Sequence, residues 1–303
     1  MTETLWTSEN YQKTAFLVLL ILLLSGLVVF FFRKKNYYFI SSWASIKSWL
    51  IVAPILFVLF GLPQPWPYVF LTLIALFGAK VFFQIMGMFH RTAFVLICYL
   101  GIMGLGGAVY FDRPDFYNAM PMVVLGLSCF VPLFRNQYHR MIQHICITLL
   151  GFIFLGWSFM HLGLIMNLPN GIYQMLYLII LTEFCDNTNV AVSRYFGGWK
   201  IAPLISSKRT VGGTLVSVLL TLALAAAMRY LLPEESPDRH WVVVGLVAAL
   251  GGIWGDLVMS VIRKDARVKI VGQFILGRGD FLQRMDRLIF VAPIFYYVMK
   301  WIG

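Results

Sequence analysis

Residues 15 to 32 read AFLVLLILLLSGLVVFFF, an uncharged stretch that follows a short polar leader. As a helix, 18 residues rise about 27 Å, which nearly crosses the roughly 30 Å hydrocarbon layer of a bilayer. The stretch lacks the small-residue cleavage site of a signal peptide. We therefore expect it to be a retained transmembrane span.

The rest of the chain repeats this pattern. Hydrophobic residues make up 60% of the 303 residues, charged residues 12%, and the mean hydropathy is +0.81. No soluble core hides that much apolar surface. Ten apolar segments cover residues 15–32, 49–63, 68–87, 93–110, 118–134, 143–166, 172–193, 211–231, 241–262 and 288–302. We therefore expect an all-α, polytopic membrane protein of about ten spans.

The basic residues predict how these spans are oriented. Of the 24 lysines and arginines, 18 lie in one set of alternate loops: Arg33, Lys34, Lys35, Lys47, Arg91, Arg135, Arg140, Arg194, Lys200, Lys208, Arg209, Arg263, Lys264, Arg267, Lys269, Arg278, Arg284 and Arg287. Lys and Arg are retained on the cytoplasmic side. Both termini are therefore predicted on the non-cytoplasmic side. The net charge of +11 matches anionic lipid headgroups, so we expect a membrane and no nucleic acid as partner.

The carboxylates divide the chain into two regions. Seven of the thirteen lie in the outer loops, and the other six lie in the last third: Glu183, Asp186, Asp256, Asp265, Asp280 and Asp286. The first six spans hold no carboxylate that could bind a metal or carry a proton. We therefore interpret residues 1–170 as a transmembrane scaffold and 171–303 as the region that carries the chemistry.

One stripe of polar residues is predicted on the ninth span. Helical spacing places Asp256, Ser260 and Arg263 or Lys264 on one face. A solvated helix end would show the same residues. A carboxylate inside a membrane protein, however, is costly and usually functional.

Two cationic loops lie beside the intramembrane aspartates. Residues 197–213 combine glycines, Ser206, Lys208, Arg209 and Thr210 just before a helix, where free N–H groups and the helix dipole favour phosphate. Residues 263–287 add seven cations with Asp280 and Asp286, whose carboxylates suit a divalent ion on a polyphosphate. Together these loops predict phosphoryl or nucleotidyl transfer at the lipid surface.

The last third of the chain carries a series of spaced motifs, namely Gly255-Asp256-Leu257, Ser260, Arg263-Lys264, Lys269, Gly272, Leu276-Gly277, Gly279, Arg284 and Asp286. This spacing resembles, without a gap, the signature of a known family, the CDP-diacylglycerol synthases or phosphatidate cytidylyltransferases. Upstream, Leu181 to Asp186 and Ser206 to Thr210 look like the family's intramembrane aspartate and its Ser-Pro-x-Lys-Thr loop. The resemblance covers about residues 180 to 300.

Four positions depart from the signature. The family's Lys-Asp is Lys269-Ile270 here, its His-Gly-Gly is Arg278-Gly279-Asp280, its Asp-Arg is Gln283-Arg284, and the Glu of its Lys-Thr-x-Glu-Gly is Gly212. The aspartate replaced by Gln283 resembles one that the family uses to hold metal ions. Asp280 is a candidate substitute.

The resemblance implies an Mg²⁺-dependent transferase that joins CTP to phosphatidate or a related lipid phosphate, giving a CDP-lipid and pyrophosphate. The implied catalytic residues are Asp256, Asp286, Lys264 and Arg284, and the metal ligands are Asp256, Asp280 and Asp286. The implied substrate-binding residues are Asp186, Ser206, Lys208, Arg209, Thr210, Ser260, Arg263, Lys269 and Arg278.

The resemblance also implies a homodimer in the bacterial inner membrane with its site on the cytoplasmic face. Three alternatives stay open: a non-catalytic relative that binds lipid phosphates or a partner protein, a transferase for another lipid phosphate or nucleotide, and a transporter. The transporter is disfavoured because no inverted repeat of broken helices is visible.

Overall fold

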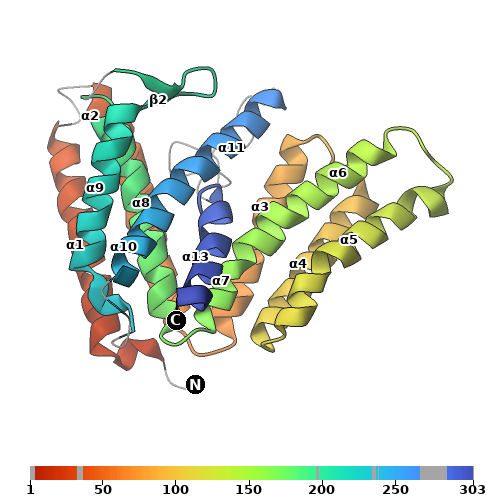
Figure 1. Ribbon diagram of the computed structural model, residues 1–303, viewed down its shortest axis with the longest axis horizontal. Helices are drawn as coiled ribbons and strands as arrows, with labels where there is room; N and C mark the ends of the chain where they lie inside the picture. The colour runs from red at the N-terminus through yellow and green to blue at the C-terminus, as the bar shows by residue number, and fades with distance from the viewer. Residues whose placement is uncertain are drawn as a thin grey trace. The chain divides into compact units, whose positions relative to one another are not determined.

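The computed structural model describes residues 4–32, 37–195, 198–233, 237, 239–266 and 285–302, with only the backbone described at 32, 37–42, 44, 45, 207 and 208. Its described part is helical apart from one two-stranded sheet (Figure 1). The elements are η1 (Leu5–Thr7), α1 (Glu9–Phe32), α2 (Tyr37–Phe60), α3 (Trp66–Ile85), α4 (Thr92–Tyr110), α5 (Pro114–Arg135), α6 (Met141–Gly151), η2 (Phe152–Ser158), α7 (Phe159–Met166), α8 (Gly171–Val192), β1 (Lys200–Ala202), β2 (Ser206–Thr210), α9 (Val211–Ala227), η3 (Arg229–Leu231), α10 (Arg239–Leu246), η4 (Val247–Gly251), α11 (Gly252–Asp265) and α13 (Leu288–Ile302).

Each of the ten predicted apolar segments coincides with helical structure. Six described helices are long and apolar enough to cross a membrane: Glu9–Phe31, Trp66–Ile85, Thr92–Tyr110, Pro114–Arg135, Met141–Met166 and Arg239–Asp265. Three shorter apolar helices cover Ile46–Phe60, Val211–Ala227 and Leu288–Ile302. The prediction of a helical integral membrane protein is thus supported. The count of about ten spans and the side of the termini stay predictions.

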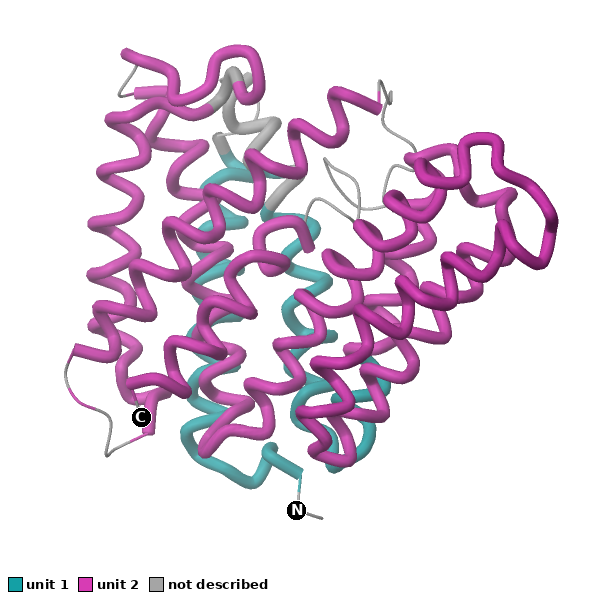
Figure 2. Tube along the Cα trace, turned by 45° about the vertical axis from the view of Figure 1, so that its right-hand side comes forward, with its two compact units in different colours: residues 1–70, 270–281 teal, residues 71–269, 282–303 magenta. Residues whose placement is uncertain are grey.

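The chain divides into two compact units, Met1–Phe70 with Ile270–Phe281 and Leu71–Lys269 with Leu282–Gly303 (Figure 2). The predicted boundary at residue 170 concerns where chemistry lies rather than how helices pack, and it stays a prediction.

The described part of the first unit is built on the pairing of α1 with α2. Tyr11 is fully buried and donates a 2.6 Å hydrogen bond to the Phe57 carbonyl oxygen. Its ring also stands edge-on to Trp6. A Cβ at Gly61 would lie 2.3 Å from the Trp6 Nε1, so a glycine is needed for this contact.

The second unit contains two groups of packed helices. In one, α4 packs on α5 and on the continuous run α6–η2–α7. In the other, α8 packs on α9 and on η4, and α13 lies against α7, η4 and α11. Helix α13 therefore contacts helices of both groups.

Two of the long predicted segments contain a π-helical turn, η2 and η4. Such turns widen a helix locally and occur often at functional sites. The backbone also packs closely where η4 leads into α11. A Cβ added at Gly251 would lie 3.1 Å from the Val291 side chain, and a Cβ added at Gly252 would lie 3.0 Å from the Thr182 side chain. The start of α11 is thereby held against α8 and α13.

The predicted loop before α9 forms an antiparallel hairpin. Strand β1 pairs with β2 in the register Lys200 to Thr210 and Ala202 to Ser206. The hairpin leads directly into α9, whose N-cap is Thr210. It therefore presents the short run of cations in β2 at one end of α8 and α9.

Candidate functional site

Helix α8 supplies two carboxylates to the site. Glu183 and Asp186 are three residues apart, so they lie on one face of the helix. Their side chains are only 10% and 15% exposed. An ionised carboxylate at this depth needs a cationic partner, since desolvation without one costs several kcal/mol.

Strand β2 supplies the first partner, Arg209. Its position is fixed at the N-cap, where the Thr210 hydroxyl accepts a 3.1 Å hydrogen bond from the Gly213 N–H and the Ser193 hydroxyl accepts one from the Thr210 N–H. A side chain at Gly213 would overlap Ser193, because its Cβ would lie 2.7 Å from the Ser193 Cα. The hairpin thus docks tightly on the end of α8.

Arg209 joins three elements of the unit. Its Nη2 lies 2.5 Å from Oδ1 of Asp186 on α8 and 2.8 Å from Oδ2 of Asp256 on α11. Its Nε donates a further 3.1 Å hydrogen bond to the same oxygen of Asp256. The Arg209 side chain is 2% exposed, so this guanidinium is buried between two carboxylates.

Helix α11 packs closely against the backbone at Asp286. A Cβ at Gly255 would lie 2.5 Å from the Asp286 carbonyl oxygen, so only glycine allows this approach. The Asp286 side chain is fully buried and forms an ion pair with Arg263, two turns further along α11. The predicted stripe on α11 therefore meets charged partners at Asp256 and at Arg263.

Arg287 completes the cluster. Its guanidinium lies 2.5 Å from Oε2 of Glu183 and 2.9 Å from Oδ2 of Asp186. The sequence alone predicts no role for Glu183 or Arg287. Two features of the sequence point to these residues: Glu183 lies one helical turn before Asp186, and Arg287 directly follows Asp286. Neither feature identifies the residue with which Glu183 or Arg287 pairs.

The cluster as described holds four carboxylates and three guanidinium groups. Burial alone lowers the pKa of Arg209, but the charges of Asp186 and Asp256 outweigh burial and raise that pKa above its ordinary value. Burial likewise lowers the pKa of Arg287, and Asp186, Glu183 and Asp256 more than compensate and raise it. Both arginines therefore stay charged.

The other predicted site residues fall into two groups. Ser206 and Lys208 lie on β2, Ser260 lies on α11 one turn after Asp256, and the exposed Lys264 donates a 2.7 Å hydrogen bond to the Leu204 carbonyl oxygen of the hairpin. The residues outside the described part of the chain are Lys269, Arg278, Asp280 and Arg284. Their predicted roles stay predictions.

Carboxylate oxygens are suitable Mg²⁺ ligands, and two of the three predicted ones, Asp256 and Asp286, belong to this cluster. Both are engaged by arginines, and among the residues described no three His, Cys, Asp or Glu side chains gather as a metal-binding group. The donor type thus fits Mg²⁺, which one or two carboxylates commonly hold together with water and phosphate oxygens.

A buried set of carboxylates and arginines, together with helices apolar enough to cross a membrane, defines a helical membrane protein with a buried ionic cluster. Comparison with protein families gives a match to the cytidylyltransferase family over residues 43–302. The chain therefore belongs to this family, and the resemblance seen in its motifs is confirmed.

Three relatives illustrate the similarity. The chain is 32% identical to the uncharacterized protein YnbB of Escherichia coli over 135 residues, or 45% of each chain. It is 26% identical to a phosphatidate cytidylyltransferase of Staphylococcus aureus over 178 residues, 58% of this chain and 65% of that enzyme. It is 24% identical to the phosphatidate cytidylyltransferase of Bacillus subtilis over 237 residues, 76% of this chain and 88% of that enzyme. The chain thus spans less than two thirds of the first two relatives.

Proposed function

We propose that this protein joins CTP to phosphatidate, or to a related lipid phosphate, and releases pyrophosphate. The observation that carries the proposal is the buried cluster of Asp186, Arg209 and Asp256 in a chain of the cytidylyltransferase family. Relatives named phosphatidate cytidylyltransferase support the choice of nucleotide and lipid. The membrane helices support a lipid substrate, since its acyl chains can stay in the bilayer during the reaction.

In the proposed reaction an oxygen of the lipid phosphate attacks the α-phosphorus of CTP. The bond from that phosphorus to the bridging oxygen of the β-phosphate breaks, and pyrophosphate leaves with the bonding electrons. The chain needs no nucleophile of its own for this step. Positioning and charge compensation supply most of such catalysis.

The arginines and lysines would neutralise the phosphates. In our proposal Arg209, Arg263 and Lys264 act with Lys208 and Arg284 on the triphosphate. Arg209 and Arg263 are held by carboxylates in the structure, so they must exchange those partners for phosphate oxygens when the nucleotide enters. The carboxylates released in this exchange are Asp256 and Asp286.

Asp256 and Asp286, with Asp280, are our candidates to hold Mg²⁺, which would supply further neutralisation of the phosphate oxygens when bound. The remaining predicted contacts, which we assign to substrate binding, are Asp186, Ser206, Thr210, Ser260, Lys269 and Arg278. Removal of divalent ions with a chelator should abolish transfer, and added Mg²⁺ should restore it.

The distribution of basic residues supports a site on the cytoplasmic face, where CTP is available. We also propose, by analogy with relatives, the bacterial inner membrane as the location and a homodimer as the assembly. Cysteine accessibility at the hairpin tip from either side of the membrane tests the orientation.

The decisive experiment is a radiolabelled assay of purified protein with CTP, Mg²⁺ and phosphatidate, which scores lipid-soluble cytidine nucleotide. Asp256→Asn should abolish the product. The matched control is Asp265→Asn, since Asp265 is exposed near the end of the same helix. Equal product from wild type and Asp256→Asn would rule out the proposed role of the cluster.

A second function is a non-catalytic relative that binds lipid phosphates or a partner protein. It is favoured by the pairing of Asp186, Asp256 and Asp286 with arginines and by Gln283 and Ile270 in place of family aspartates. Folded protein that binds phosphatidate but gives no product with CTP or other nucleotides would support it.

A further inference from the structure

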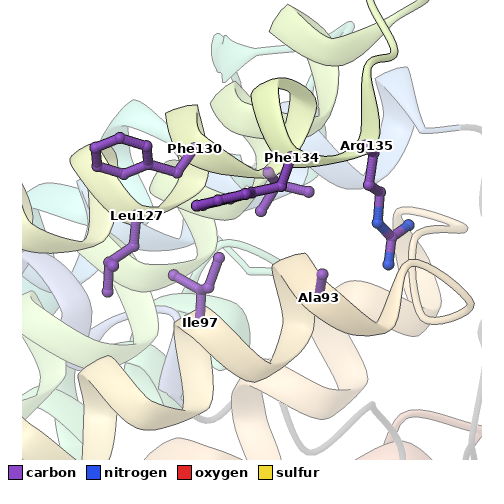
Figure 3. A pocket seen from close by; sticks show the side chains of 7 residues that line it. Ala93, Ile97, Leu127, Phe130, Phe134 and Arg135 are labelled. Carbon is purple, nitrogen blue, oxygen red and sulfur yellow. The ribbon is translucent and has the colours of Figure 1, made fainter.

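A groove lies between α4 and α5, apart from the ionic cluster. It is open to its surroundings, has a volume of about 340 Å³ and is lined by Ala93, Ile97, Leu127, Phe130, Val131, Phe134 and Arg135. Figure 3 shows the apolar side chains of the two helices facing one another, with Arg135 reaching from the end of α5 toward the start of α4. The groove is therefore apolar along its length and cationic at one end.

Exposed aromatic side chains lie at the cationic end and support its position at the level of the membrane surface. Phe134 is 87% exposed and Tyr138, just beyond α5, is 92% exposed. Tyrosine and tryptophan side chains at the ends of spans concentrate where headgroups meet the acyl chains, so Tyr138 supports this placement. The apolar part of the groove then runs along the hydrocarbon layer, and Arg135 lies at the height of lipid phosphates.

The charges at this end are of one sign. Arg91 precedes α4, Arg140 precedes α6, and both lie near His144 of α6. The buried Nε of Arg91 has no hydrogen-bond partner among the described residues. The carboxylates of this helix pair, Asp112 and Asp115, lie at its opposite end, and the sequence from residue 116 to 182 contains none. Among the described residues of α4, α5 and α6 this end therefore has cations and no carboxylate, and an anion would complement its charge.

We propose that this groove binds one acyl chain of an anionic phospholipid from the surrounding bilayer, with the lipid phosphate on Arg135 and Arg91 at the same end. The apolar walls suit a chain of methylenes. Because the charged groups at the cationic end are all positive, this end favours an anionic headgroup over a zwitterionic one. The groove is distinct from the transfer site, since the cluster belongs to α8, β2 and α11. Figure 1 shows α5 and α9 on opposite sides of the second unit.

Native mass spectrometry of the delipidated, full-length chain tests the proposal with phosphatidylglycerol and phosphatidylcholine of identical acyl chains. Wild type should retain at least one phosphatidylglycerol under conditions that remove phosphatidylcholine. Arg135→Gln should bind phosphatidylglycerol about fivefold more weakly, the effect expected of one cation at a membrane surface. Ala93→Phe should fill the groove and remove the retained lipid.

Two controls separate the groove from general effects. Arg113→Gln removes a cation at the other end of the same helix pair, and Leu96→Phe adds bulk at an exposed position of α4. Both should retain phosphatidylglycerol as wild type does. The proposal would be overturned by equal retention of both lipids, or by unchanged retention of phosphatidylglycerol in Arg135→Gln and Ala93→Phe. It would also be overturned if the wild type formed a dimer without bound lipid and Ala93→Phe disrupted that dimer. None of these results depends on cytidylyl transfer.

Discussion

Two regions of the second unit carry arginines at the ends of packed helices. The positive charges of these arginines are compensated in opposite ways in the two regions. Around α8 and α11, Arg209 and Arg287 are buried and each is held by two carboxylates. At the end of α5, Arg135 is exposed beside apolar walls, and no carboxylate occurs in residues 116–182. A buried guanidinium must have its partner inside the protein, whereas a guanidinium at the membrane surface can take its partner from the bilayer.

The largest effect is expected from Arg209→Ala. It leaves Asp186 and Asp256 buried without their shared cation, and removal of one partner from a buried pair costs about 3–5 kcal/mol. We expect a large fall in the unfolding midpoint measured in detergent, together with loss of transfer activity.

Arg209→Lys is the matched control, since it keeps the charge but loses the two-sided contact. It should recover part of the stability and little of the activity. A melting curve of Arg209→Ala that overlays the wild type would show that the ion pairs do not hold the site together.

The next effect concerns the pair Glu183 and Arg287. In a double-mutant cycle, Glu183→Gln and Arg287→Gln should each destabilise the protein, and the double variant should recover a coupling of about 0.5–3 kcal/mol. Additive effects would mean that the two charges act independently. The Michaelis constant for CTP should rise in Glu183→Gln if this pair positions Asp186.

Gly255→Ala should destabilise by about 1–3 kcal/mol, because its new methyl would overlap the Asp286 carbonyl oxygen. The controls are Gly107→Ala on α4 and Gly126→Ala on α5, where an added Cβ meets no atom within 4 Å. These two should be neutral or slightly stabilising by helix propensity. If Gly255→Ala had the same free energy of unfolding as the two controls, this would contradict the close approach of α11 to the backbone at Asp286.

The smallest effect on stability is expected from Arg135→Gln. Surface substitutions usually change the free energy of unfolding by less than about 0.5 kcal/mol. In protein stripped of lipid the unfolding midpoint should therefore stay near that of the wild type. A loss as large as that of Arg209→Ala would show that Arg135 has a partner within the protein, and the contrast between the two ends would disappear.

Much of the fold follows from local sequence. The ten apolar segments coincide with helices because the bilayer requires each span to satisfy its own backbone hydrogen bonds. The family follows from motif spacing between residues 180 and 300, and the full match over residues 43–302 confirms it. The two-stranded hairpin was not predicted, because glycines and cations before a helix look the same in a loop and in a short sheet.

The sequence by itself therefore determined a helical membrane protein, its family and the segment that carries its ionisable residues, since hydropathy and motif spacing are local properties. Only the tertiary structure decided which charges meet. The pair of Glu183 and Arg287 joins residues 104 positions apart, and Arg209 reaches Asp256 across 47. Such pairs depend on how α8, α11, α13 and the hairpin pack, and glycines at Gly213 and Gly255 set that packing by allowing backbones to approach.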